Sequence, residues 1–87
     1  MATGIVWVYG TIACGDTART RRFLAAHNVP FEFRDILSDD EARKALEQVT
    51  GGEHITPVVL FPDGTTLIEP TDQQLAAHLG IAGAASS

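Results

Sequence analysis

The sequence predicts a mixed α/β fold of four strands and three helices in the order βαβαββα. Three observations support this fold class. Short apolar runs alternate with helix-like stretches, capping patterns precede two of those stretches, and an Asp-Gly turn separates the last two apolar runs. The helix between the first two strands makes that pair parallel, whereas the hairpin is antiparallel. We therefore expect a mixed four-stranded sheet with helices on its faces.

The first part of the chain provides a strand, a helix and a second strand. Residues 5–9 are apolar and rich in β-branched side chains, which favours a strand buried on both faces. A helix is expected from about Gly15 to His27, because apolar residues recur there at helical spacing and Pro30 follows. Residues 31–34 alternate apolar and polar side chains, as a second strand does, and the strand is expected to run on to Asp35 or Ile36. The inward face of the helix is expected to carry Thr20, Phe23, Leu24 and His27.

A second helix follows residues 38–41, whose sequence Ser-Asp-Asp-Glu matches a capping box with Ser38 as the N-cap. Gly51-Gly52 ends this helix. Its inward face is expected to carry Ala42, Ala45, Leu46 and Val49.

The last part of the chain is a hairpin followed by a short helix. Strands are expected over residues 58–61 and 66–69, with Asp63-Gly64 in the turn. Residues 71–74, Thr-Asp-Gln-Gln, form a second capping-box pattern. We expect a single domain over residues 1–87, of which 82–87 are a frayed tail.

Composition and charge exclude several functions. The net charge is −5, which disfavours nucleic-acid binding, and the arginines between residues 19 and 22 are interpreted as a solvated helix face. The apolar runs are too short to cross a membrane, and no signal peptide is expected. Three histidines and one cysteine show no ligand spacing, so no metal site is predicted. The single cysteine excludes a disulfide within the chain and fits the cytoplasm.

That cysteine, Cys14, is expected where the first strand ends and the first helix begins. Unsatisfied N–H groups and partial positive charge at a helix N-terminus favour thiolate over thiol, which makes a cysteine nucleophilic. Gly15 leaves the backbone open beside the sulfur, and the Thr17 hydroxyl is placed to donate to it. Asp16 acts in the opposite direction, because it brings negative charge close to the sulfur. The alternative is a small, buried and inert cysteine.

The element order and two short segments resemble the glutaredoxins of the thioredoxin fold, from Ile5 to Leu79. Tyr9 and the segment Cys14-Gly15-Asp16-Thr17, in place of the family's Cys-x-x-Cys, carry the first part of the resemblance. The second part is Ile55-Thr56-Pro57, in place of Thr-Val-Pro. Within the family, the chain looks most like the mycoredoxins, the actinobacterial branch that works with mycothiol. The segments that suggest this branch are Thr50-Gly51-Gly52, Ile55-Thr56-Pro57 and Glu69-Pro70-Thr71.

The resemblance implies a role for each matching residue. Cys14 would attack a mixed disulfide, and Thr56 would offer its backbone to the substrate beside a cis Pro57. Arg19 would contact the substrate, and Tyr9 would border the cleft, whereas Trp7, on the same side of the strand, is expected in the core. Thr71 and Asp72 match the region that holds the γ-glutamyl group of glutathione.

Taken together, these features predict a monothiol thiol-disulfide oxidoreductase that reduces mixed disulfides between proteins and a small thiol. The co-substrate would be mycothiol or glutathione, with no tightly bound cofactor and a monomeric chain. One alternative is an iron–sulfur cluster held between two protomers, as in monothiol glutaredoxins with a Cys-Gly-Phe-Ser site. The other is a degenerate, non-catalytic binding module, since Ala13, Asp16 and Thr17 all depart from the typical family pattern.

Overall fold

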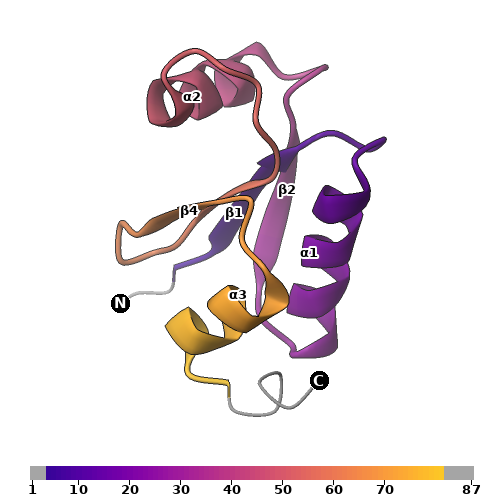
Figure 1. Cartoon of the computed structure of the whole chain (residues 1–87), viewed down its shortest axis with the longest axis vertical. Helices are drawn as coiled ribbons and strands as arrows, with labels where there is room; N and C mark the ends of the chain where they lie inside the picture. The colour runs from indigo at the N-terminus through magenta and orange to yellow at the C-terminus, as the bar shows by residue number, and fades with distance from the viewer. Residues whose placement is uncertain (1–3, 82–87) are drawn as a thin grey trace.

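The computed structural model describes residues 4–81, and the predicted frayed tail, 82–87, lies outside the described residues. The predicted order of elements is confirmed (Figure 1). The elements are β1 (Val6–Gly10), α1 (Gly15–Ala26), β2 (Phe31–Asp35), α2 (Asp40–Thr50), β3 (Val58–Leu60), β4 (Thr66–Ile68) and α3 (Asp72–Leu79). No helix in the described part of the chain is long and apolar enough to span a membrane.

The four strands form one mixed sheet in the order β2-β1-β3-β4. β1 runs parallel to β2, with Val8 opposite Phe33, and antiparallel to β3, with Val8 opposite Val59. β3 and β4 form the predicted antiparallel hairpin, which pairs Val59 with Leu67. Because β1 lies inside the sheet, its carboxyl end is held on both sides, and the segment that leaves it toward α1 starts from a fixed point.

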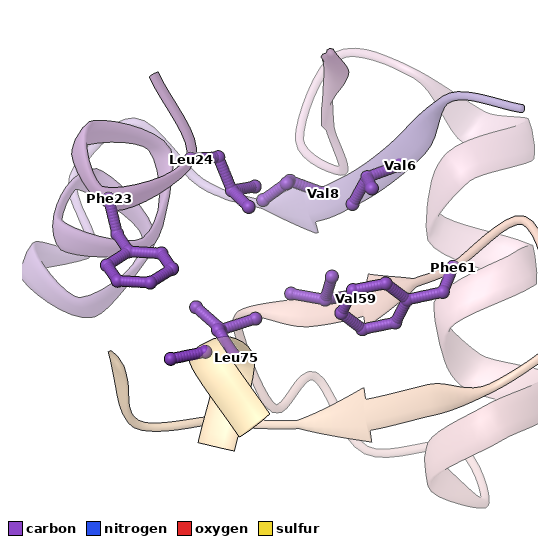
Figure 2. Packing of buried hydrophobic residues seen from close by; sticks show 8 residues of the cluster. Val6, Val8, Phe23, Leu24, Val59, Phe61 and Leu75 are labelled. Atoms are coloured by element: carbon purple, nitrogen blue, oxygen red, sulfur yellow. The ribbon is translucent and has the colours of Figure 1, made fainter. Parts of the chain in front are cut away.

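The two faces of the sheet carry separate apolar clusters. Helices α1 and α3 pack on one face, where Val6 and Val8 of β1 meet α1, α3 and β3 (Figures 1 and 2). Helix α2 packs on the other face. The buried members of the first cluster are Val6, Val8, Phe23, Leu24, Val59, Phe61, Leu75 and Ala76. Those of the second are Ile36, Ala42, Leu46 and Val58, against which Tyr9 packs.

The expectation that the first strand is buried on both faces was wrong. Only every second residue of β1 is buried, and Ile5, which precedes the strand, is 43% exposed. Trp7 is half-buried rather than in the core, and the Arg34 guanidinium lies over its ring at 5.1 Å from the centroid. The physical reason is that the cluster beneath α2 includes Tyr9 but does not extend to Trp7.

The N-cap of α2 is Asp39 and not the predicted Ser38. Oδ1 of Asp39 accepts hydrogen bonds from the backbone N–H groups of Glu41 and Ala42, each at 3.1 Å. Its other oxygen, Oδ2, accepts from the Arg34 guanidinium of β2 at 2.8 and 3.0 Å. This second contact lowers the pKa of Asp39, with the hydrogen bonds at the helix terminus adding to the effect.

The remaining helix boundaries follow the predictions closely. Gly51 ends α2 with a left-handed backbone, φ 80°, which favours glycine. Val49 does not complete the predicted inward face of α2, since it is 43% exposed. The capping box of α3 is confirmed: Thr71 Oγ1 accepts from Gln74 N, and Gln74 Oε1 accepts from Thr71 N.

Candidate active site

Cys14 is the N-cap residue of α1, on the loop that leaves the carboxyl end of β1. A turn positions it, since its N–H donates to the Thr11 carbonyl at 3.2 Å and its carbonyl accepts from Ala18 at 3.1 Å. The side chain is half-buried, and Sγ lies 3.9 Å from the carbonyl oxygen of Thr56. The predicted location at a strand–helix junction is therefore confirmed.

Thr17, one turn further along α1, is fully buried beneath this junction. It packs directly against Gly10, where an added Cβ would lie 2.7 Å from the Thr17 methyl carbon. Only glycine fits at the end of β1 with Thr17 in this place. The Thr17 hydroxyl has no hydrogen-bond partner among the described residues. A buried hydroxyl without a hydrogen-bond partner is unfavourable. A negative charge that develops beside it is therefore stabilised, because the hydroxyl can donate a hydrogen bond to it.

The group that gains a negative charge is Cys14, when its thiol loses a proton and becomes a thiolate. The Thr17 side chain is the main reason that the pKa of Cys14 lies below that of an ordinary thiol, because its free hydroxyl can donate to the charged sulfur. The Thr56 side chain and the backbone N–H groups of Thr17 and Asp16 lower the pKa further, whereas partial burial opposes them. The site therefore stabilises a negative charge on the sulfur.

Asp16 contributes a donor as well as a charge. Its backbone N–H is among the groups that lower the pKa of Cys14. Its carboxylate is 64% exposed and lies 3.8 Å from Nε of Arg19. The repulsion that the sequence led us to expect is thus reduced by solvent and by a nearby guanidinium.

The bond between Thr56 and Pro57 is cis, as the resemblance implied. Pro57 is buried, and its carbonyl accepts a hydrogen bond from Glu69 N at 2.8 Å. This bond ties the start of β3 to the segment between β4 and α3. The cis bond therefore lies at Cys14, since the Thr56 carbonyl faces the sulfur.

The structure brings Arg19 and Asp72 together, although 53 residues separate them. Arg19 Nη1 donates to Asp72 Oδ1 at 2.5 Å, and Nη2 donates to the Pro70 carbonyl at 3.0 Å. These bonds fix the first residues of α3 beside α1. Thr71, between Pro70 and Asp72, is exposed and makes the capping box described above.

Tyr9 packs in the apolar cluster beneath α2. Its side chain packs on the face of the sheet that α2 covers, whereas Thr17 belongs to α1, which covers the opposite face. Here it lines a small apolar cavity of about 40 Å³, together with Ala45, Leu46, Val49, Val58, Leu60 and Thr66. The geometry thus gives Tyr9 a packing role, and no described contact joins it to Cys14.

Two features of the site escaped the sequence analysis. The first is Gly10, whose missing side chain makes room for Thr17. A glycine that ends a strand immediately before a reactive loop was the available signal. The second is the Pro70 carbonyl, which receives Arg19 and has no signature in the sequence, because any backbone carbonyl can accept such a bond.

Comparison with known proteins agrees with this geometry. Residues 6–65 match the glutaredoxin family model. Two proteins named as glutaredoxins, from two strains of Mycobacterium tuberculosis, are each 32% identical to this chain over 79 residues. The matched region covers 91% of this chain and 94% of each relative.

Solved structures give the same result for the fold. The thioredoxin-like protein BC3987, crystallised as a point mutant, matches with a TM-score of 0.78 and 27% identity, over 88% of this chain and 96% of its own. A glutaredoxin from Archaeoglobus fulgidus matches with a TM-score of 0.70 and 28% identity, over 90% of this chain and 88% of its own. The fold is thus thioredoxin-like, and the chain belongs to the glutaredoxin family, whose members are thiol oxidoreductases that act on protein disulfides with the help of small thiols.

Proposed function

We propose that this chain is a monothiol glutaredoxin that reduces mixed disulfides between proteins and a small thiol, with Cys14 as the nucleophile. The observation that carries the proposal is the environment of Cys14: a helix N-terminus, a buried Thr17 hydroxyl without another partner, and a lowered pKa. Because Cys14 is the only cysteine in the chain, no second thiol of this chain can resolve the intermediate.

The reaction proceeds by two thiol-disulfide exchanges. The Cys14 thiolate attacks the small-thiol sulfur of the mixed disulfide, and the protein substrate leaves as its thiolate and takes up a proton. Cys14 then holds the small thiol as a new disulfide. A second small-thiol molecule, as its thiolate, attacks this disulfide, so that the oxidised small thiol leaves and Cys14 returns as thiolate. A lowered pKa helps here, since it makes Cys14 a better leaving group.

The surroundings of Cys14 support a placement for the small thiol. The Thr56 carbonyl, 3.9 Å from Sγ, and the adjacent Pro57 would contact the cysteine-like part of the bound molecule. Thr71 and Asp72, at the N-terminus of α3, would contact the remainder, with Arg19 holding Asp72 in position.

We further propose mycothiol, an uncharged sugar-linked thiol, as the preferred co-substrate over glutathione. Glutathione carries an ammonium and two carboxylates that need charged partners. In this chain the Asp72 carboxylate already accepts from Arg19, and the Thr71 N–H already donates to Gln74. The groups at the N-terminus of α3 are therefore largely paired with one another, which supports a neutral ligand. The small thiol acts as a co-substrate, and we propose that a monomer without a resident cofactor acts in the cytoplasm.

The proposal is tested by the reduction of a reporter peptide in mixed disulfide with mycothiol or with glutathione, while a reductase regenerates the small thiol. We expect turnover by the wild type, faster with mycothiol, and none by Cys14→Ser. Thr17→Cys should retain turnover and divert part of the protein into an internal disulfide. The absence of any Cys14-dependent rate with either thiol would contradict the proposal. A brown purified protein would instead favour the cluster-binding alternative.

A further inference from the structure

Two carboxylates share one guanidinium on the helix that begins at Cys14. Asp16 lies two residues after Cys14 in the first turn of α1, and its side chain is 64% exposed. Asp72, whose side chain is 40% exposed, pairs with Arg19 at 2.5 Å. Arg19 reaches Asp16 only at 3.8 Å. One guanidinium, engaged mainly by Asp72, cannot neutralise both carboxylates, so negative charge remains around Asp16.

A third carboxylate belongs to Glu69. Glu69 is exposed, and its backbone N–H is bonded to the Pro57 carbonyl at 2.8 Å. Pro57 follows Thr56, whose carbonyl lies 3.9 Å from the sulfur of Cys14. We call Asp16, Asp72, Arg19 and the exposed Glu69 the rim, a set that holds three carboxylates against one cation.

A separate observation marks Cys14 as the reacting group beside these charges. The Thr17 hydroxyl is fully buried, has no partner among the residues described, and contributes to holding charge on Cys14. Asp16 is more exposed than Asp72 and lies farther from Arg19, at 3.8 Å rather than 2.5 Å. Because Asp16 is also only two residues from Cys14, its charge acts most directly on a disulfide that approaches the sulfur.

We infer that Asp16 determines the charge preference of Cys14, so that cationic disulfides react faster than anionic ones. The inference rests on the proposed function, since it takes Cys14 as the nucleophile. The substrate class that it names is a disulfide flanked by positive charge, such as a cysteine within a basic segment of a protein. The chemical step is unchanged: Cys14 forms a bond to one sulfur, and the other sulfur leaves with the electron pair as a thiolate.

The expected size of the effect follows from Coulomb's law. In water, one unit charge on the protein that lies about 8 Å from the substrate charge changes the reaction rate by roughly 2-fold for each unit of charge on the substrate. The ratio of rates for a cationic and an anionic disulfide is therefore expected to change by at least about 3-fold when Asp16 loses its charge. Because surface charges are screened, the ratio is expected to fall as salt is added.

The test uses three small disulfides of similar size: cystamine, which is cationic, hydroxyethyl disulfide, which is neutral, and dithiodipropionate, which is anionic. Single-turnover rates with the reduced full chain are divided by the rates of dithiothreitol, an uncharged thiol, with the same compounds, which removes their intrinsic reactivities. The variant is Asp16→Asn. The ratio of cationic to anionic rates is the readout, because a change in the pKa of Cys14 alters both rates equally.

The matched control is Asp40→Asn, since Asp40 also lies in the first turn of its helix and pairs with an arginine three residues later. It removes the same charge from the chain, on the face of the sheet opposite α1. We expect wild type and the control to prefer cystamine, and Asp16→Asn to lose most of that preference. Equal normalised rates in the wild type, or equal shifts in both variants, would overturn the inference alone. No reaction with the neutral disulfide would overturn the proposed function as well.

Discussion

Thr17 lies one helical turn after Cys14, where a Cys-x-x-Cys motif has its second thiol. The structure gives this threonine two tasks. Its side chain fills the space beside Gly10, and its hydroxyl supports the charge on Cys14. At the scale of single residues, the site thus has a hydrogen-bond donor where a resolving thiol would stand, and this donor stabilises the thiolate but cannot attack a mixed disulfide.

Replacing Thr17 by valine should therefore raise the pKa of Cys14, because the main hydrogen bond to the thiolate is lost. The lowered pKa keeps more Cys14 as thiolate at neutral pH, so alkylation by iodoacetamide should be slower at that pH in Thr17→Val. The midpoint of the alkylation rate plotted against pH should move to higher pH, toward the value of about 8.5 for a free thiol. The rates above that midpoint should be similar to those of the wild type.

The helix provides a control for this substitution. Thr20 is also fully buried in α1, and its hydroxyl has no partner among the described residues. It is not among the groups that affect the pKa of Cys14. Thr20→Val should leave the alkylation profile unchanged. If both valine variants shift it equally, packing rather than the Thr17 hydroxyl controls the thiol.

At the scale of elements, the approach of α1 to β1 depends on the contact between Gly10 and Thr17. Gly10→Ala should destabilise the fold by roughly 1–3 kcal/mol, because an added methyl overlaps a buried side chain. Denaturant unfolding measures this loss. Gly15→Ala is the matched control, since an added Cβ there meets nothing within 4 Å. The double variant Gly10→Ala, Thr17→Ala removes both atoms nearest to the added methyl, so it should lose less stability than the sum of the two single variants. A loss equal to that sum would contradict the steric explanation.

The beginnings of the helices show how far local sequence predicts elements. The capping box of α3 was predicted correctly because all its atoms come from residues 71–74. The cap of α2 was placed at Ser38, one residue too early, because Asp39 is held by Arg34 of the neighbouring strand. A local pattern could not include that partner, since only the folded sheet brings the arginine to the helix.

For the whole molecule, the order of the elements along the chain and the directions of the first and last strand pairs followed from the alternation of apolar runs and helices, and the structure confirms both. The order of the strands within the sheet, β2-β1-β3-β4, was not predicted, because it depends on contacts between strands that are distant in the sequence. The sequence did not predict how much of each face of the sheet the helices cover. Trp7 appeared to be a core residue because strand periodicity places it with Tyr9, yet only Tyr9 packs beneath α2. Periodicity identifies the side of a strand, whereas burial depends on how far a helix extends over it.

Only part of the candidate site could be predicted from the sequence, for a similar reason. The position of Cys14 follows from local sequence, whereas its contact with Thr56 crosses 42 residues and the pair of Arg19 with Asp72 crosses 53. The resemblance to a family, rather than the pattern of residues, suggested that these segments meet. The sequence did not predict that Arg19 pairs with Asp72, because this pair depends on side-chain geometry at the N-terminus of α3.

The central claim is that Cys14 alone carries the small thiol during turnover. Intact mass spectrometry tests it directly, on protein stopped by acid while it reduces a mycothiol-linked reporter. We expect one small-thiol adduct per chain, located on the Cys14 peptide, absent from Cys14→Ser, and lost when reduced mycothiol is added. Turnover without this adduct, or an adduct that added thiol cannot remove, would contradict the account.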